Sequence, residues 1–215
     1  MELISDAFQQ GGFWMFLILG ISIIALAIVL ERFVFLYFKY SINANAFMSQ
    51  VQKLVLANNL DRAIKQCNQA PDAALPKVVK AGLTRANKGE EAIQNAIEEA
   101  SLEVVPMIGR RIPALLALAN IATLLGLLGT IAGLIEAFAA LETATAENRQ
   151  QMLAKGISTA MYTTAFGLIV AIPTMLAHLI LSGMSKRIID EIDQHSVKLG
   201  NLLVAQAKGG RAAGE

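Results

Sequence analysis

The amino-acid sequence predicts an all-α membrane protein with three transmembrane helices, a large helical cytoplasmic insertion and long helices that extend from the membrane. Of its 215 residues, 55% are hydrophobic and 16% are charged, whereas a typical soluble domain has about 25% charged residues. Three runs contain no Asp, Glu, Lys or Arg: 7–30, 112–135 and 156–185. Each exceeds the roughly 20 residues that a helix needs to cross a bilayer. The segments between them repeat apolar residues at helical spacing.

The first apolar run is predicted to remain in the protein as a transmembrane helix over residues 13–38. Residues 1–12 carry acidic side chains but no Lys or Arg, and no small-residue cleavage site follows, unlike a secretory signal. Aromatic residues at both ends, Trp14 and Tyr37 among them, are typical of interfacial belts. Glu31 and Arg32 are expected to anchor the inner end by reaching headgroups or each other.

Residues 39–111 are predicted to form a helical domain outside the membrane. Its last helix starts after the stop signal Lys88-Gly89. We expect that helix to run almost directly into the second transmembrane helix over residues 112–138, with Pro106 and Pro113 bending it at the membrane surface.

A loop over residues 139–155, a third transmembrane helix over 156–184 and a C-terminal helix and tail over 185–215 complete the predicted order. The Lys and Arg residues fix the orientation. The first twelve residues have none and the loop has two, but the insertion has ten and the tail has five. By the positive-inside rule, the insertion and tail face the cytoplasm, and the N-terminus and loop face the other side.

The second apolar run is rich in small residues. Gly126, Gly129 and Gly133 lie within eight residues, although glycine destabilises a helix interior by about 1 kcal/mol relative to alanine. Gly129 and Gly133 form a Gly-x-x-x-Gly pair, which lets membrane helices approach closely. With Gly167 of the third run, these glycines are predicted to be helix-packing positions.

Hydroxyl groups accompany these glycines. Thr130 lies in the second run, and Thr159, Thr163 and Thr164 lie in the third. The pattern fits two arrangements. In one, the threonines line a narrow polar path; in the other, each hydroxyl bonds to a carbonyl of its own helix, as is common in membrane helices.

No carboxylate lies deep within a predicted transmembrane helix, because Glu31 and Glu136 are near helix ends and His178 is near the cytoplasmic end. A proton-driven device needs a protonatable group inside the membrane. Either this protein moves no protons or a partner chain supplies the group. The sequence has no phosphate loop and no His/Cys cluster at metal spacing, so we predict no catalytic residue, metal or cofactor. A net charge of +1 gives no indication of nucleic-acid binding.

The run LLGLLGTIAGLIEAF, the run GISTAMYTTAFGLIVAIP, the pair Glu31-Arg32 and the stretch AIKQCNQAPDAALPKVVKAGL resemble the MotA/TolQ/ExbB proton-channel family. The three-helix members of the ExbB and TolQ type are the most similar. Thr130 and Thr164 match the pore-facing threonines of that family. Two positions depart from the pattern: many members have Glu where this chain has Thr159 and Pro where it has Thr123.

The resemblance implies a multi-pass subunit of a motor in the bacterial inner membrane, with a periplasmic N-terminus and a cytoplasmic C-terminus. Five copies would surround two copies of a single-span ExbD/TolR-like partner, whose aspartate carries the proton. A TonB/TolA-like energy transducer would receive the work. Envelope maintenance, gliding motility and sodium-driven work are alternatives within the family. A secondary transporter and a passive membrane scaffold are alternatives outside it.

Overall fold

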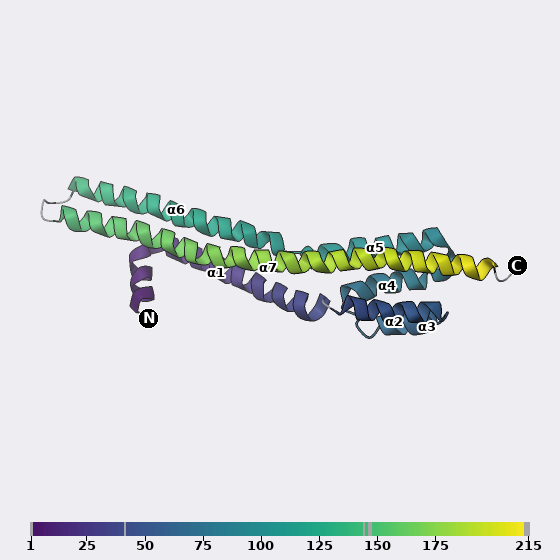
Figure 1. Cartoon of the computed structure of the whole chain (residues 1–215). Helices are drawn as coiled ribbons and strands as arrows, with labels where there is room; N and C mark the ends of the chain where they lie inside the picture. The colour runs from purple at the N-terminus through teal and green to yellow at the C-terminus, as the bar shows by residue number, and fades with distance from the viewer. Residues whose placement is uncertain (1, 41, 144, 146–147, 213–215) are drawn as a thin grey trace. The chain divides into compact units, whose positions relative to one another are not determined.

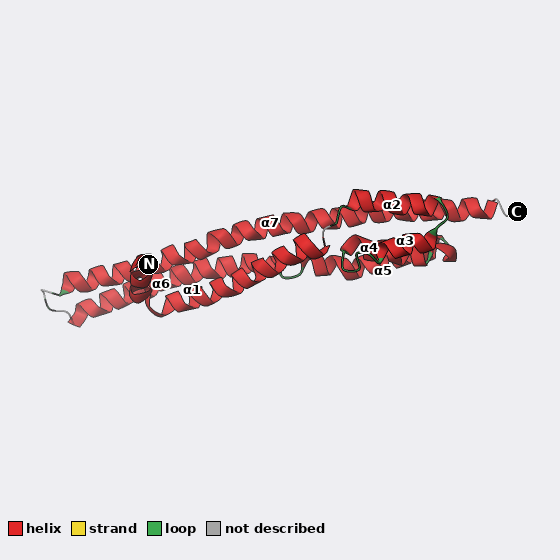
Figure 2. Cartoon of the chain, turned by 90° about the horizontal axis from the view of Figure 1, so that it is seen from below, coloured by secondary structure: helices red, strands yellow, loops and turns green. Residues whose placement is uncertain are grey.

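The computed structural model describes residues 2–40, 42–143, 145 and 148–212, and every regular element within these residues is a helix (Figure 2). The prediction of an all-α fold is therefore confirmed. The chain divides into two compact units. We call residues 1–31 and 111–180 the membrane unit and residues 32–110 and 181–215 the soluble unit.

Three helical stretches are long and apolar enough to cross a membrane: 12–38, 90–142 and 149–206. Large apolar side chains cover the outside of the membrane unit; Leu124 is 62% exposed and Ile169 is 66% exposed. In water this pattern would be unfavourable, but hydrocarbon is the natural environment for such a surface. The prediction of three membrane helices is confirmed.

Helix α1 (Glu2–Val34) begins with a segment that turns away from the rest of the helix at Gly12 (Figure 1). Gly12 has a φ of 62°, a conformation that glycine adopts without steric strain. The helix continues into a π-helical segment, η1 (Phe35–Tyr40). Ile18 of α1 is fully buried against a small apolar cluster in the membrane unit.

Helices α6 (Ile112–Thr143) and α7 (Arg149–Ala212) run antiparallel and side by side through the membrane unit (Figure 1). The loop between them is described only in part, because residues 144, 146 and 147 lie outside the described part of the chain. Ala119 and Ala122 of α6 and Val170 and Ala171 of α7 form the apolar cluster around Ile18. The membrane core is thus built mainly from small side chains.

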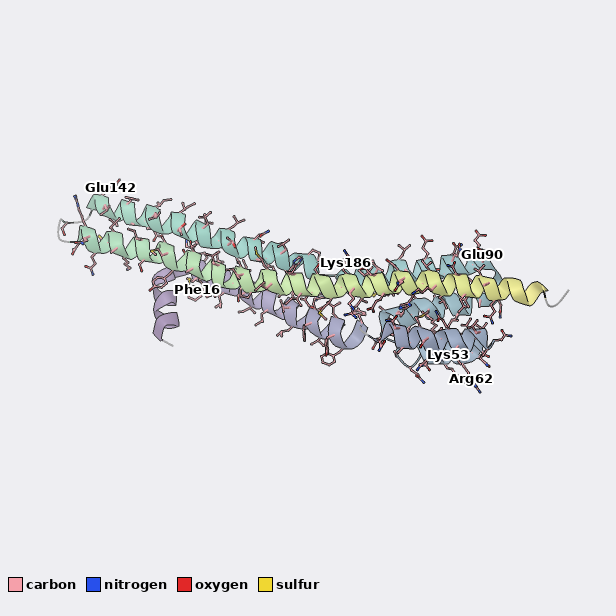
Figure 3. All side chains as sticks on the ribbon, in the orientation of Figure 1. Phe16, Lys53, Arg62, Glu90, Glu142 and Lys186 are labelled. Atoms are coloured by element: carbon pink, nitrogen blue, oxygen red, sulfur yellow. The ribbon has the colours of Figure 1, made fainter. Side chains whose placement is uncertain are left out.

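Besides the end of α1 and η1, the described part of the soluble unit contains five helices between Ala44 and Gly109 and the part of α7 that follows Ile180. These helices are α2 (Ala44–Leu56), α3 (Leu60–Cys67), α4 (Ala74–Thr84), η2 (Ala86–Lys88) and α5 (Glu90–Gly109). Val55, Val78, Ile93 and Leu199 are fully buried, and Gln206 of α7 donates a hydrogen bond to the Val55 carbonyl at 2.7 Å. Figure 3 shows charged side chains such as Arg62 on the outside of the unit.

The structure places a sharper break between α5 and α6 than the sequence predicts. Helix α5 ends at Gly109, and Arg111 adopts a left-handed φ of 63° before α6 begins. Pro113 explains the position, since it has no N–H to donate to the carbonyl of Gly109 and disfavours helical backbone at the preceding residue. Pro106 remains inside α5.

The expectation that Arg32 reaches lipid headgroups is wrong. Its side chain is 5% exposed, and its guanidinium donates a hydrogen bond at 3.1 Å to the carbonyl of Met107. Met107 lies in the last turn of α5, where carbonyls lack a partner within the helix. Glu31 forms an ion pair with Arg111.

Cys67 is 2% exposed in the core of the soluble unit, and burial raises the pKa of its thiol to about 11 despite the opposing charge of Lys80. A rise of two pH units from the ordinary value leaves roughly one hundredth of the usual thiolate at neutral pH. We expect maleimide to modify the folded protein at least about 100-fold more slowly than the unfolded chain. Mass spectrometry after timed labelling at pH 7.5 measures both rates, and equal rates would contradict the buried position.

His195, in the soluble part of α7, is 4% exposed, and burial lowers its pKa below the ordinary 6.5, helped by Lys198 and opposed by Glu191. As pH falls through 6.5, the unfolded chain takes up this proton first. The free energy of unfolding that depends on neutral His195 is therefore fully present above about pH 6.5, and it is lost as pH falls towards the pKa of His195 in the folded protein.

Thermal unfolding of the purified protein at pH 7.5 and pH 5.5 tests this effect of His195. The variant His195→Gln removes the titrating group, so it is expected to lose less stability on acidification than the natural chain. An identical acid-induced drop in melting temperature for both proteins would show that His195 contributes nothing to it.

Candidate functional site at the contact between two membrane helices

The three glycines of α6 face the backbone of α7. A methyl group on Gly126 would meet the carbonyl oxygen of Thr163 at 3.1 Å, and one on Gly133 would meet the Gly156 carbonyl at 3.2 Å. A methyl group on Gly129 would overlap the Thr163 side chain at 2.7 Å. The missing side chains allow the two helices to approach at backbone distance.

Gly167 supplies the matching surface on α7. A methyl group there would meet the Ala122 carbonyl oxygen at 2.8 Å and the Cα of Gly126 at 3.2 Å. Both obstacles are backbone atoms, which cannot rotate away. The glycines expected to pack helices therefore all lie where α6 and α7 meet.

Most of the threonine hydroxyls bond to their own helices, as one of the two arrangements left open by the sequence requires. Thr123 donates to Ala119 at 3.1 Å and Thr130 to Leu127 at 2.6 Å. Thr163 donates to Ala160 at 2.9 Å and is completely buried. Thr164 differs, because its hydroxyl crosses to the Gly126 carbonyl of α6 at 3.3 Å.

The contacts of α1 distinguish the two flanks of the α6–α7 pair. Leu125 of α6 and Phe166 of α7 pack against the cluster around Ile18 of α1. At about 100° per residue, Thr123 lies on the side of α6 opposite Leu125, and Thr164 lies on the side of α7 opposite Phe166. We call this side, away from α1, the threonine flank.

The four threonines expected to line a channel do not share one surface. Thr130 lies on the threonine flank about 140° from Leu125, and it is partly exposed, as is Thr164. Thr163 is enclosed between the helices. Thr159 precedes Phe166 by seven residues and so lies within about 20° of it, towards α1. The structure thus brings Thr130 and Thr164 to one flank and separates Thr159 from them.

No acidic or basic side chain faces the threonine flank between Thr123 and Thr164 among the residues that the structure describes. Glu31 is paired with Arg111 at the end of α1, and Glu136 is exposed in the last part of α6. Across the described ranges, no group of His, Cys, Asp and Glu side chains is arranged to hold a metal. The flank offers hydroxyl and carbonyl oxygens but no group that takes up a proton near neutral pH.

One polar residue on this flank was missed by the sequence analysis. Asn120 is exposed on α6 one turn before Thr123. The search for charge-free runs hides it, since an amide carries no charge. The sequence does carry the signal, because Asn120 is the only Asn or Gln in 112–138.

Residues 68–194, more than half of the chain, match the MotA/TolQ/ExbB proton channel family. The chain belongs to this family. An ExbB-like biopolymer transport protein of Synechocystis sp. is 30% identical over 170 residues, which cover 78% of this chain and 80% of that protein.

Two further comparisons agree with the family. TolQ, the Tol-Pal system protein of Haemophilus influenzae, is 33% identical over 116 residues, which cover 54% of this chain and 44% of TolQ. The solved structure of MotAB from C. jejuni aligns with 94% of this chain and 80% of that chain, with a TM-score of 0.66 and 16% identity. That likeness concerns the fold alone.

Membership of the MotA/TolQ/ExbB family makes this protein a multi-pass inner-membrane subunit of an energy-transducing channel rather than a member of an enzyme family. The family also implies that the subunit works in an oligomer with a stator-like partner.

Proposed function

We propose that this chain forms the wall of a proton path in a bacterial inner-membrane motor, and that a single-span ExbD/TolR-like partner supplies the acid on which the proton moves. The observation that carries the proposal is the threonine flank. Thr130 and Thr164 present partly exposed oxygens there, while the described flank holds no carboxylate. An aspartate on a partner helix facing this flank completes the path.

The proposed assembly has five copies of this chain around two copies of the partner. The soluble unit and the end of α7 face the cytoplasm, because the Lys and Arg residues concentrate there, and the N-terminus faces the periplasm. Proton motive force supplies about 2.3 kcal/mol per charge per 100 mV, so several protons would be used in one working step. A TonB/TolA-like transducer is the proposed recipient of that work.

The replacement Thr130→Val tests the path. Valine keeps the shape and removes the hydroxyl, so assembly should remain normal while the work driven by proton motive force falls at least about tenfold, equivalent to about 1.4 kcal/mol in a barrier. Cells carrying the complex are assayed for that work with and without an uncoupler. The amount of complex is measured in parallel by native gel electrophoresis.

Thr174→Val is the matched control. Thr174 also donates to its own helix, to Val170 at 2.7 Å, but it is only 8% exposed. It follows Gly167 by seven residues, so it lies within about 20° of the face of α7 that meets α6 rather than on the flank. It should retain its function. Full activity in Thr130→Val with normal assembly would count against a polar path at this position.

A further inference from the structure

Asn120 is the only Asn or Gln within residues 13–38, 112–138 and 156–184, the three predicted transmembrane segments. Its position is deep. It lies nine positions after Arg111, whose ion pair with Glu31 marks the polar end of α6, and nine positions along a helix rise about 13 Å. Because the hydrocarbon layer is about 30 Å thick, the Asn120 amide lies inside it.

The Asn120 side chain is exposed, and within the described residues its amide takes part in no hydrogen bond. An amide without a partner in hydrocarbon is unfavourable by several kcal/mol. Lipid is therefore not its environment in the assembled protein. Water or a polar group of another chain must meet it.

The direction of the side chain decides between these environments. Asn120 lies about 140° from Leu125, the residue that faces α1, about 60° from Thr123 and about 80° from Thr130, so all three lie on the side of α6 away from α1. It therefore extends the threonine flank by one turn towards Arg111. The order along this flank is Asn120, Thr123 and Thr130, with Thr164 contributed by α7.

A hydrogen bond from Asn120 to a polar side chain of a neighbouring copy explains its position less well. The Thr123 hydroxyl already donates to Ala119, so the nearest hydroxyl on the flank has no donor to spare. In a ring, neighbouring copies contact each other through different surfaces. Asn120 of one copy therefore approaches Asn120 of the next only around the central axis, where the path itself lies.

We infer that Asn120 lines a water-filled crevice through which the ion path continues from Thr123 to the cytoplasmic surface. The amide accepts and donates hydrogen bonds to water or hydronium and so keeps this part of the path hydrated. This inference rests on the proposed function, because it extends the same threonine flank.

Cysteine accessibility tests the inference without depending on activity. Asn120→Cys and Ile121→Cys are made in the full chain and expressed with its natural partners. Ile121 is the matched control, since it is next in sequence and 45% exposed but points to another side of α6. In inside-out vesicles, a membrane-impermeant thiosulfonate reaches only the cytoplasmic side. The natural chain measures background labelling, which should be low because its one cysteine, Cys67, is buried and has a raised pKa.

The expected result is labelling at position 120 at least about ten times faster than at position 121, as for a thiol that water ionises and a thiol in lipid. Equal labelling at the two positions, or no labelling at 120, would overturn the crevice. If Asn120→Cys does not assemble, Asn120→Ser and Asn120→Leu are compared for driven work. Serine should retain it, leucine should lose about tenfold, and full work with leucine would overturn the inference.

The two experiments can reject the threonine path and the Asn120 crevice independently of each other. A labelled position 120 with full activity in Thr130→Val leaves the crevice standing and rejects the threonine path. An unlabelled position 120 with an inactive Thr130→Val leaves the path standing and rejects its continuation along Asn120.

Discussion

Replacing Gly167 with alanine is expected to disrupt the α6–α7 pair. The added methyl group would lie 2.8 Å from the Ala122 carbonyl oxygen and 3.2 Å from the Cα of Gly126, so the two backbones must separate. Overpacking of this kind destabilises a core by about 1–3 kcal/mol, and valine should have a larger effect. Melting of the purified complex and its yield in native gels measure the loss.

Gly20→Ala is the matched control for this prediction. Gly20 lies in the apolar part of α1, and a methyl group there would meet no atom within 4 Å. Both variants gain the same helix propensity, about 1 kcal/mol, so the comparison isolates close packing. If Gly167→Ala is as stable as Gly20→Ala, the two helices do not approach as closely as the structure shows.

Arg32→Met is the second change with a large expected effect. Arg32 is buried, caps the last turn of α5 through the Met107 carbonyl at 3.1 Å, and lies with its guanidinium carbon 5.8 Å from the centre of the Phe35 ring. A hydrogen bond from a charged group contributes about 1.5–3 kcal/mol. Methionine retains the apolar stem but loses the donors, so the soluble unit should lose about 2 kcal/mol.

The control for Arg32 is Arg187→Met. Arg187 pairs with Glu191, which lies one turn further along α7, but the Arg187 side chain is 82% exposed. Such surface pairs contribute less than about 1 kcal/mol to the free energy of unfolding. Hydrogen exchange of α5 amides and thermal melting compare the two variants. A similar, small loss in both would show that Arg32 acts only as a surface anchor.

The membrane helices could be predicted from the sequence because lipid imposes a simple rule. A helix of about 20 residues without charge has few other stable environments, and glycines spaced for close contact have few other uses in such a helix. Gly126 and Gly133 face α7 for this local reason, so their spacing was enough to predict that they lie at a close contact between helices.

The remaining features depend on contacts that sequence spacing does not contain. Arg32 finds its partner Met107 75 positions along the chain, and the left-handed turn at Arg111 is set by the helix break before Pro113. The separation of Thr159 from Thr164 follows from where α1 packs, which periodicity on α7 alone cannot give. Asn120 was visible in the sequence, but its exposure is a property of the fold.

Proton flux into proteoliposomes tests the central claim most directly. Two preparations are compared: this chain alone, and the complex purified through a tag on this chain from cells that contain its natural partners. With a membrane potential imposed, a pH-sensitive dye inside the vesicles reports entry of protons. We expect flux only from the complex, and no flux above that of empty vesicles from this chain alone. Proton entry through this chain alone, blocked by Thr130→Val, would contradict the claim that a second chain supplies the acid.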